Sequence, residues 1–149
     1  MIRIIHRITG TVALGLIATF WLSTVLSELL GSQAAVVAVK TTIPWGFLLL
    51  VPALIAVGGS GFALAQGRRR GLVGAKAKRM PVIAANGILV LIPSALFLAS
   101  KAGAAAFDTS FYAVQVLELL AGAVNITLLG LNMRDGLKMR QGRLRHRAA

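Results

Sequence analysis

Residues 110–133 read SFYAVQVLELLAGAVNITLLGLNM, an apolar run in which Glu118 is the single charged residue. A helix needs about 20 mainly apolar residues to cross a bilayer, and this run is long enough. A carboxyl near the centre of a spanning helix costs about 2.5–3.5 kcal/mol to insert, so we expect Glu118 to face other helices instead of lipid. The run therefore predicts a membrane-spanning helix with one side turned toward a protein interior.

Three further segments share this length and apolar character, namely residues 8–30, 44–65 and 81–100. The chain of 149 residues is 57% hydrophobic and 13% charged, with a mean hydropathy of +0.82. Soluble domains are about 45–50% apolar and about 25% charged. The chain is thus predicted to be an all-α integral membrane protein, a single domain formed by a four-transmembrane-helix bundle.

Prolines and small polar residues mark the helix ends in this prediction. Pro44 and Pro81 suit the first turn of a helix, where a missing N–H costs nothing, and Asp108, Thr109 and Ser110 offer N-caps for the fourth span. Pro52 and Pro93 fall inside spans and predict kinks. The apolar segment 34–43 is too short to span, so it either extends a neighbouring helix or lies along the outer interface.

The basic residues gather at three places along the chain. There are 16 Lys and Arg against four Asp and Glu, and all of the basic residues except Lys40 and Lys101 lie before the first span, between the second and third, or after the fourth. In a four-span protein these places share one side of the membrane, and cytoplasmic loops carry the Lys and Arg excess. We therefore expect both termini, including the basic tail 134–149, to be cytoplasmic in a multi-pass protein of the bacterial cytoplasmic (inner) membrane.

The basic loop and tail also predict a partner. Clusters of about four to eight Lys and Arg beside a span gain about 1 kcal/mol per charge on an anionic lipid surface. No aromatic residue is interleaved with these clusters, so they lack the stacking platform that single-stranded nucleic acids use. We expect contact with anionic headgroups and no binding of nucleic acid.

A stripe of polar and small side chains surrounds Glu118 in the fourth span. Its members recur at steps of three and four residues and so share one helical face. At a rise of about 1.5 Å per residue, Ser23 of the first span and Ser94 of the third lie at the same depth as Glu118. Asn86 of the third span and Asn125 of the fourth share a second level, farther from the outer face. The predicted interior polar site comprises Glu118, Gln115, Ser94, Ser23, Asn125 and Asn86.

Two further expectations concern this interior. Because Lys40 and Lys101 are assigned to outer loops, Glu118 has no cation at its depth and should be largely neutral. Asn86 and Asn125 can hydrogen-bond to each other across a seam at which the glycine-rich run 58–61 lets the helix backbones approach closely.

The stretch His6-Arg7-Ile8-Thr9-Gly10 resembles the His-Arg-x-Ser/Thr-Gly signature of the cytochrome b membrane-anchor subunit of succinate dehydrogenase. In that family the signature lies near the quinone site, so the resemblance implies a quinone-side role for Arg7 and Thr9. It also implies association with a respiratory complex and haem b. The haem-ligating histidine that the family carries in its second span is absent here, and Arg3 stands where the family has a serine.

Few residues are available for catalysis. The chain has no cysteine and contains neither a Ser–His–Asp order nor a glycine-rich phosphate loop, so we expect no enzymatic activity, no metal site and no evident cofactor apart from the haem b or quinone of the resemblance. The leading interpretation is a non-catalytic membrane subunit or accessory protein that packs against itself or other subunits. The alternatives are a small proton or solute carrier that uses Glu118, and a quinone or haem pocket of a respiratory anchor subunit.

Overall fold

The computed structural model describes residues 1–65 and 71–148, and in these residues the secondary structure is entirely helical. The elements are α1 (Ile2–Leu30), α2 (Gln33–Ala65), α3 (Gly71–Asn86), a π-helical turn η1 (Gly87–Leu91), α4 (Ile92–Gly103) and α5 (Thr109–Ala148). Since α3, η1 and α4 follow one another without a break, the described residues form four helices that are long and apolar enough to cross a membrane. The predicted all-α, four-helix architecture is confirmed.

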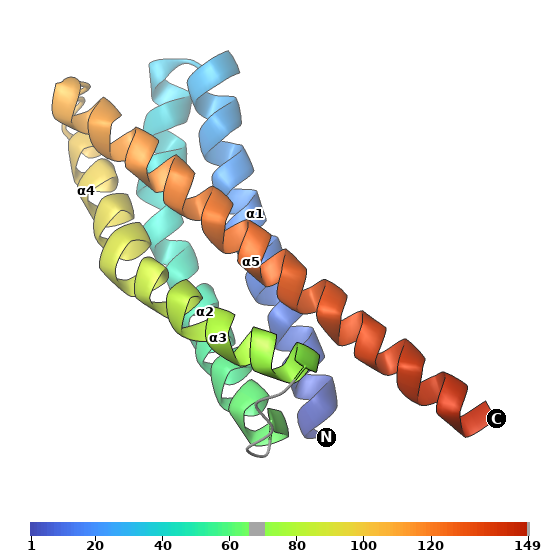
Figure 1. The fold of residues 1–149 in the computed structure, drawn as a ribbon. Coiled ribbons are helices and arrows are strands. Elements are labelled where there is room, and N and C mark those ends of the chain that lie inside the picture. The colour runs from blue at the N-terminus through green and yellow to red at the C-terminus, as the bar shows by residue number, and fades with distance from the viewer. Residues whose placement is uncertain (66–70, 149) are drawn as a thin grey trace.

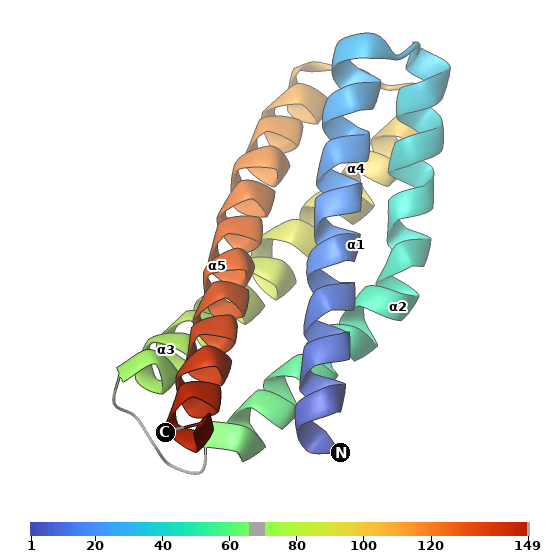
Figure 2. The ribbon, with the colours of Figure 1, turned by 90° about the vertical axis from the view of Figure 1, so that its right-hand side faces the viewer.

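The helices run alternately up and down, and both chain ends lie at the same end of the bundle (Figures 1 and 2). We call this the terminal end, and the opposite end, which carries the turns at residues 31–32 and 104–108, the distal end. The longest helix, α5, has 40 residues and projects beyond the other helices at its C-terminal end (Figure 1). At about 1.5 Å per residue it exceeds the ~30 Å hydrocarbon thickness about twofold.

Two of the expected helix starts are wrong, because α2 begins at Gln33 and α3 at Gly71, well before Pro44 and Pro81. Both prolines lie inside continuous helices. Near Pro44, Thr41 and Thr42 donate their hydroxyls to carbonyls of the preceding turn, and spanning helices tolerate proline where such groups satisfy the local backbone. Segment 34–43 is therefore the first part of α2, which decides between the two alternatives left by the sequence.

The third of the four long helices contains a widened turn directly before Pro93. The N–H of Ile92 donates to the carbonyl of Gly87, five residues earlier, and proline has no N–H with which to continue regular α-helical bonding. The disturbance predicted at Pro93 thus takes the form of a π-turn. Pro52 lies inside α2, which changes direction along its length (Figure 2).

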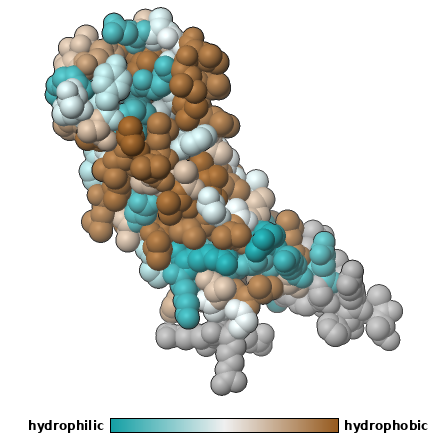
Figure 3. All heavy atoms as spheres, turned by 45° about the horizontal axis from the view of Figure 1, so that its top comes forward, coloured by the Kyte–Doolittle hydropathy of each residue, from teal (hydrophilic) through white to brown (hydrophobic). Residues whose placement is uncertain are grey.

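Apolar packing is concentrated in two clusters at different heights. The larger lies toward the terminal end and joins α1, α2, α3 and α5 through Ala13, Ile17, Leu50, Ala53, Val57, Ile83 and Leu129. The smaller lies at the distal end and consists of Val36, Leu98, Ala102 and Phe111. The face seen in Figure 3 is largely hydrophobic over its middle, with hydrophilic residues gathered toward its two ends. Between the two clusters is a polar layer.

Candidate functional site

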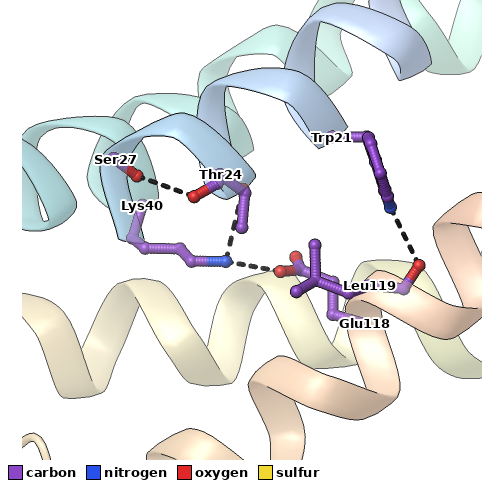
Figure 4. A network of polar contacts seen from close by, with 6 residues as sticks. All are labelled: Trp21, Thr24, Ser27, Lys40, Glu118 and Leu119. Atoms are coloured by element: carbon purple, nitrogen blue, oxygen red, sulfur yellow. Dashed lines mark hydrogen bonds and ion pairs between the residues drawn. The ribbon is translucent and has the colours of Figure 1, made fainter. Parts of the chain in front are cut away.

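A buried ion pair joins α2 to α5. The Nζ atom of Lys40 lies 2.5 Å from Oε2 of Glu118, and the two side chains are 1% and 12% exposed. Figure 4 shows the lysine reaching across from α2 to the carboxylate. The expectation that Glu118 lacks a cationic partner is therefore wrong. The reason is the early start of α2, which makes Lys40 a residue of a packed helix instead of an outer loop.

Hydroxyl groups of α1 complete the surroundings of the ammonium group. Lys40 Nζ donates to Oγ1 of Thr24 at 3.4 Å, and Ser27 donates its hydroxyl to the carbonyl of Thr24 at 3.0 Å. Thr24 and Ser27 are both buried. Ser23 takes no part, because its hydroxyl donates to the carbonyl of Thr19 in the preceding turn. Of the adjacent residues Ser23 and Thr24, only Thr24 directs its hydroxyl toward the ion pair.

The other predicted members of the Glu118 level are buried nearby without contacting the carboxylate. Ser94 of α4 is 6% exposed and Gln115 of α5 is 4% exposed. Both atoms of the Gln115 amide group lack a hydrogen-bond partner among the described residues, as does Oε1 of Glu28 on α1. Among the described residues, these three atoms are the buried side-chain nitrogen and oxygen atoms without a hydrogen-bond partner, and all three lie toward the distal end.

Trp21 fastens α1 to α5 one turn below the ion pair. Its indole N–H donates to the carbonyl of Leu119 at 2.9 Å (Figure 4). The ring occupies space that only a glycine leaves open, since a Cβ atom at Gly122 would lie 2.8 Å from Cδ1 of Trp21. Gly122, on the polar face of α5, thus makes room for an aromatic ring from α1.

A cavity of about 60 Å³ lies on the terminal side of the ion pair. Glu118, Thr24 and Trp21 are the lining residues with polar side-chain atoms, and the rest of the wall is mainly apolar residues of α1, α2, α4 and α5 together with Leu91. Ligand pockets for drug-sized molecules measure about 300–1,000 Å³. This cavity therefore has room for a few water-sized groups and not for a large cofactor.

The two asparagines predicted to meet are in contact. Asn86 donates through Nδ2 to Oδ1 of Asn125 at 2.9 Å and also to the carbonyl of Ala121. Asn125 donates to the carbonyl of Ile83, so each amide is tied to the opposite helix as well. The asparagine contact between α3 and α5 is confirmed.

The glycine-rich run takes no part in that seam. Cβ atoms placed at Gly58 and Gly59 would meet nothing within 4 Å, so the expected close backbone approach at these residues is wrong. The neighbouring residues contact α1 instead: Ser60 Oγ lies 2.9 Å from His6 Nδ1, and Gly61 faces the His6 ring. The signature histidine thus packs against α2.

A second ion pair, which the sequence reasoning did not identify, joins α3 to α5 toward the terminal end. Arg79 donates to Oδ2 of Asp135 at 2.7 Å and to Oδ1 of Asn132 at 3.3 Å. Asp135 is 3% exposed and Arg79 24%. The available signal was spacing, because Asp135 follows Asn132 by three residues and continues the polar face of α5.

The remaining predicted residues lie on the outside of the bundle or outside the described part. Arg7 is exposed, and Thr9 donates to the carbonyl of Ile5. Thr9 also borders an open apolar groove of about 310 Å³ between α1 and α2, together with Val12, Leu49, Pro52 and Ala53. The basic residues at 68–70 and the side chains at 140 and 142–149 lie outside the described residues.

At the distal end, Asp108 forms the predicted N-cap of α5. It accepts hydrogen bonds from the Phe111 N–H at 3.0 Å and from Ser110, and it pairs with Lys101 at 2.5 Å. These contacts, led by the Lys101 bond, hold the pKa of the Asp108 carboxyl well below its usual range. The carboxylate is therefore the form that caps the helix.

No group of three or more metal-ligating side chains occurs in the part of the chain that the structure describes. No protein-family model, curated protein or solved structure matches the chain.

Proposed function

We propose that this protein is a non-catalytic accessory subunit of the bacterial cytoplasmic membrane, with four spanning helices and both termini in the cytoplasm. The observation that carries this proposal is the buried Lys40–Glu118 pair, which satisfies the strongest polar groups of the interior between α2 and α5. An unpaired charge in a spanning helix points to a ligand or a transported ion, whereas a pair held within the bundle ties helices together.

The other interior polar contacts support the same interpretation. Trp21 links α1 to α5, the asparagine pair links α3 to α5, and Arg79 and Asp135 link the same two helices nearer the termini. Each contact joins two different helices. A bundle fastened at several heights is suited to act as a rigid packing surface for another subunit.

We propose two kinds of partner. The first is a second copy of the chain or another membrane subunit that packs against the apolar helix faces. The second is anionic lipid at the terminal end, where most of the Lys and Arg residues of the sequence are concentrated. No nucleic-acid partner is proposed.

The proposal is tested by replacing both charges at once with apolar residues of similar volume. The double variant Lys40→Met/Glu118→Leu should retain its expression level and its co-purifying subunits, measured by native mass spectrometry after gentle detergent extraction. Buried ion pairs can often be replaced in this way without loss of stability. Loss of the assembly from a double variant that still folds would contradict a purely structural role of the pair.

A proton or small-solute carrier is the second candidate, and one observation favours it: the Glu118 carboxylate borders the interior cavity. Under this proposal Glu118 exchanges a proton during transport. Glu118→Gln should then abolish pH-dependent flux in proteoliposomes, with Asp108→Asn at the more exposed N-cap of α5 as the carboxyl control. Absence of any proton flux in the wild-type protein would remove this candidate.

A further inference from the structure

Positive charge is in excess around the Arg79–Asp135 pair at the terminal end. Arg134 lies 3.7 Å from the Asp135 carboxylate, and Lys138 and Lys76 lie within electrostatic reach of it. The other three acidic residues of the chain all lie in the distal half of the bundle. Four basic side chains of the described residues therefore share one carboxylate here, and three positive charges are left without a counter-charge.

Lys76 is the member of this group whose hydrogen bonding is incomplete. It is half-buried on α3, and its ammonium group makes neither a hydrogen bond nor an ion pair with the described residues. Its Nζ atom lies against α5, 3.6 Å from the position that a Cβ atom would take at Gly136. Three N–H donors thus lie beside a part of α5 that carries no side chain. An anion held there would satisfy them.

The neighbouring side chain of α1 does not supply that anion. His6 lies within electrostatic reach of Lys76, and its Nδ1 atom lies 2.9 Å from Ser60 Oγ. Because Ser60 donates its own hydroxyl proton to the carbonyl of Ala56, His6 is the donor in this bond. A histidine ring is neutral or cationic. The negative charge that would balance Lys76 is therefore absent from the described residues around it.

Exposed apolar side chains lie at the same level as the unpartnered lysine. Leu72 lies one turn before Lys76 on α3, and Met133 and Leu137 lie within one turn of Gly136 on α5. A soluble anion gains nothing from such neighbours, whereas a phospholipid presents a phosphate and acyl chains together. Basic pockets between spanning helices at the cytoplasmic side are suited to the headgroups of anionic lipids.

We propose that Lys76 and Gly136 form a binding site for the phosphate of an anionic phospholipid between α3 and α5. The Lys76 ammonium group donates to a phosphate oxygen beside Gly136, and the acyl chains lie along the exposed apolar residues. Arg134 and Lys138 supply further positive charge from α5. The proposal deepens the lipid contact of the proposed function, on whose membrane insertion it rests, by naming one site in place of a diffuse attraction to the whole basic end.

A lipid titration of the full-length protein in detergent, followed by native mass spectrometry, tests the role of Lys76. The matched control is Lys78→Gln, which removes one charge from an exposed position two residues along the same helix. Phosphatidylglycerol should bind Lys76→Gln about tenfold more weakly than wild type, because a hydrogen bond to a charged group is lost. It should bind Lys78→Gln about twofold more weakly, and Lys76→Arg should retain binding.

A second variant tests the site without changing its charge, and it decides the question if Lys76→Gln does not fold. Gly136→Leu places a side chain beside Lys76 Nζ, where the phosphate would lie. It should weaken the binding of phosphatidylglycerol about tenfold. Gly130→Leu is the control, because a Cβ atom at Gly130 meets nothing within 4 Å. This control should bind the lipid as wild type does.

Three results would overturn the proposal. The first is equal weakening by Lys76→Gln and Lys78→Gln, which indicates diffuse attraction. The second is equal affinity of the wild-type protein for phosphatidylcholine and phosphatidylglycerol. The third is displacement of the lipid by millimolar inorganic phosphate, which identifies a soluble phosphate as the ligand. The accessory role is judged separately, by the subunits that co-purify with Lys40→Met/Glu118→Leu, so failure of one proposal is distinguishable from failure of the other.

Discussion

At the scale of single residues, the interior is governed by the cost of burying charge among apolar helices. Lys40 reaches Glu118 through four methylene groups, so its ammonium group is placed in the interior while its backbone stays in α2. Neither charge would be tolerated at this burial alone. Each charge is therefore stable at its buried position because the opposite charge lies beside it.

Breaking the pair from one side should be far more costly than removing it whole. Lys40→Met leaves the Glu118 carboxylate without its partner and should lower the free energy of unfolding by about 3 kcal/mol at neutral pH. The double variant Lys40→Met/Glu118→Leu should return close to wild type. Denaturation in mixed micelles measures the free energy of unfolding of both variants. The matched lysine control is Lys101→Met, which removes the partner of Asp108. Its effect should be smaller, because Lys101 is more exposed than Lys40. Equal losses in the single and double variants would show that the pair is not coupled.

Gly122 should be sensitive to the addition of a single methyl group. In Gly122→Ala the new Cβ atom meets the Trp21 ring at 2.8 Å, and forced overpacking costs about 1–3 kcal/mol. The same change at Gly130 on α5 meets nothing within 4 Å and should be neutral or slightly stabilising. Thermal unfolding and Trp21 emission, measured in a Trp45→Phe background, separate the two variants. An unshifted emission in Gly122→Ala would contradict the close contact.

At the scale of helices, α5 organises the bundle by presenting one polar face to its neighbours. Along this face Glu118 contacts α2, Asn125 contacts α3, and Asp135 contacts α3 again one level lower. The intervening residue Gly122 accepts a side chain from α1. The spacing of these residues along the 40-residue helix therefore sets the height at which each neighbouring helix contacts α5.

The asparagine pair should contribute a measurable share of the docking of α3 on α5. In a double-mutant cycle of Asn86→Ala and Asn125→Ala, we expect a coupling energy between about 0.6 and 1.7 kcal/mol, the range found for interhelical hydrogen bonds in membranes. Asn132→Ala serves as control, because Asn132 contacts Arg79 and not Asn86. Additive effects of the two alanine substitutions at 86 and 125 would show that the contact adds no stability.

At the scale of the whole molecule, the placement of charge follows the placement of the chain ends. Both termini, the end of α2 and the start of α3 lie at the terminal end (Figure 1), and most basic residues of the sequence belong to these parts of the chain or adjoin them. The distal end carries Lys101 paired with Asp108 and has few other charges. Such an asymmetry orients a multi-pass protein with its basic end in the cytoplasm.

Reporter fusions should show this orientation directly. A fluorescent protein fused after Ala149 should be bright, and alkaline phosphatase inserted into the turn at residues 104–108 should be active in the periplasm. The reciprocal pair of fusions serves as the control, with phosphatase inactive at the C-terminus. An active C-terminal phosphatase would reverse the proposed topology and place the distal end on the cytoplasmic side.

The sequence by itself determined the number of long apolar helices, the polar face of α5 and the meeting of Asn86 with Asn125. These follow from local quantities, namely hydropathy over about 20 residues, helical periodicity and rise per residue. Residue type limited the cap of α5 to Asp108, Thr109 or Ser110, and the structure selected Asp108.

Only the tertiary structure decided which residues face one another across the bundle. The start of α2 at Gln33 moved Lys40 from an expected loop into the interior, and helix rotation selected Thr24 over Ser23. Rotation also directed the glycine-rich run away from the asparagine seam. Rotation about a helix axis and the continuation of a helix past a proline depend on packing between helices. That packing is settled by contacts between residues far apart in the chain, which local sequence patterns do not contain.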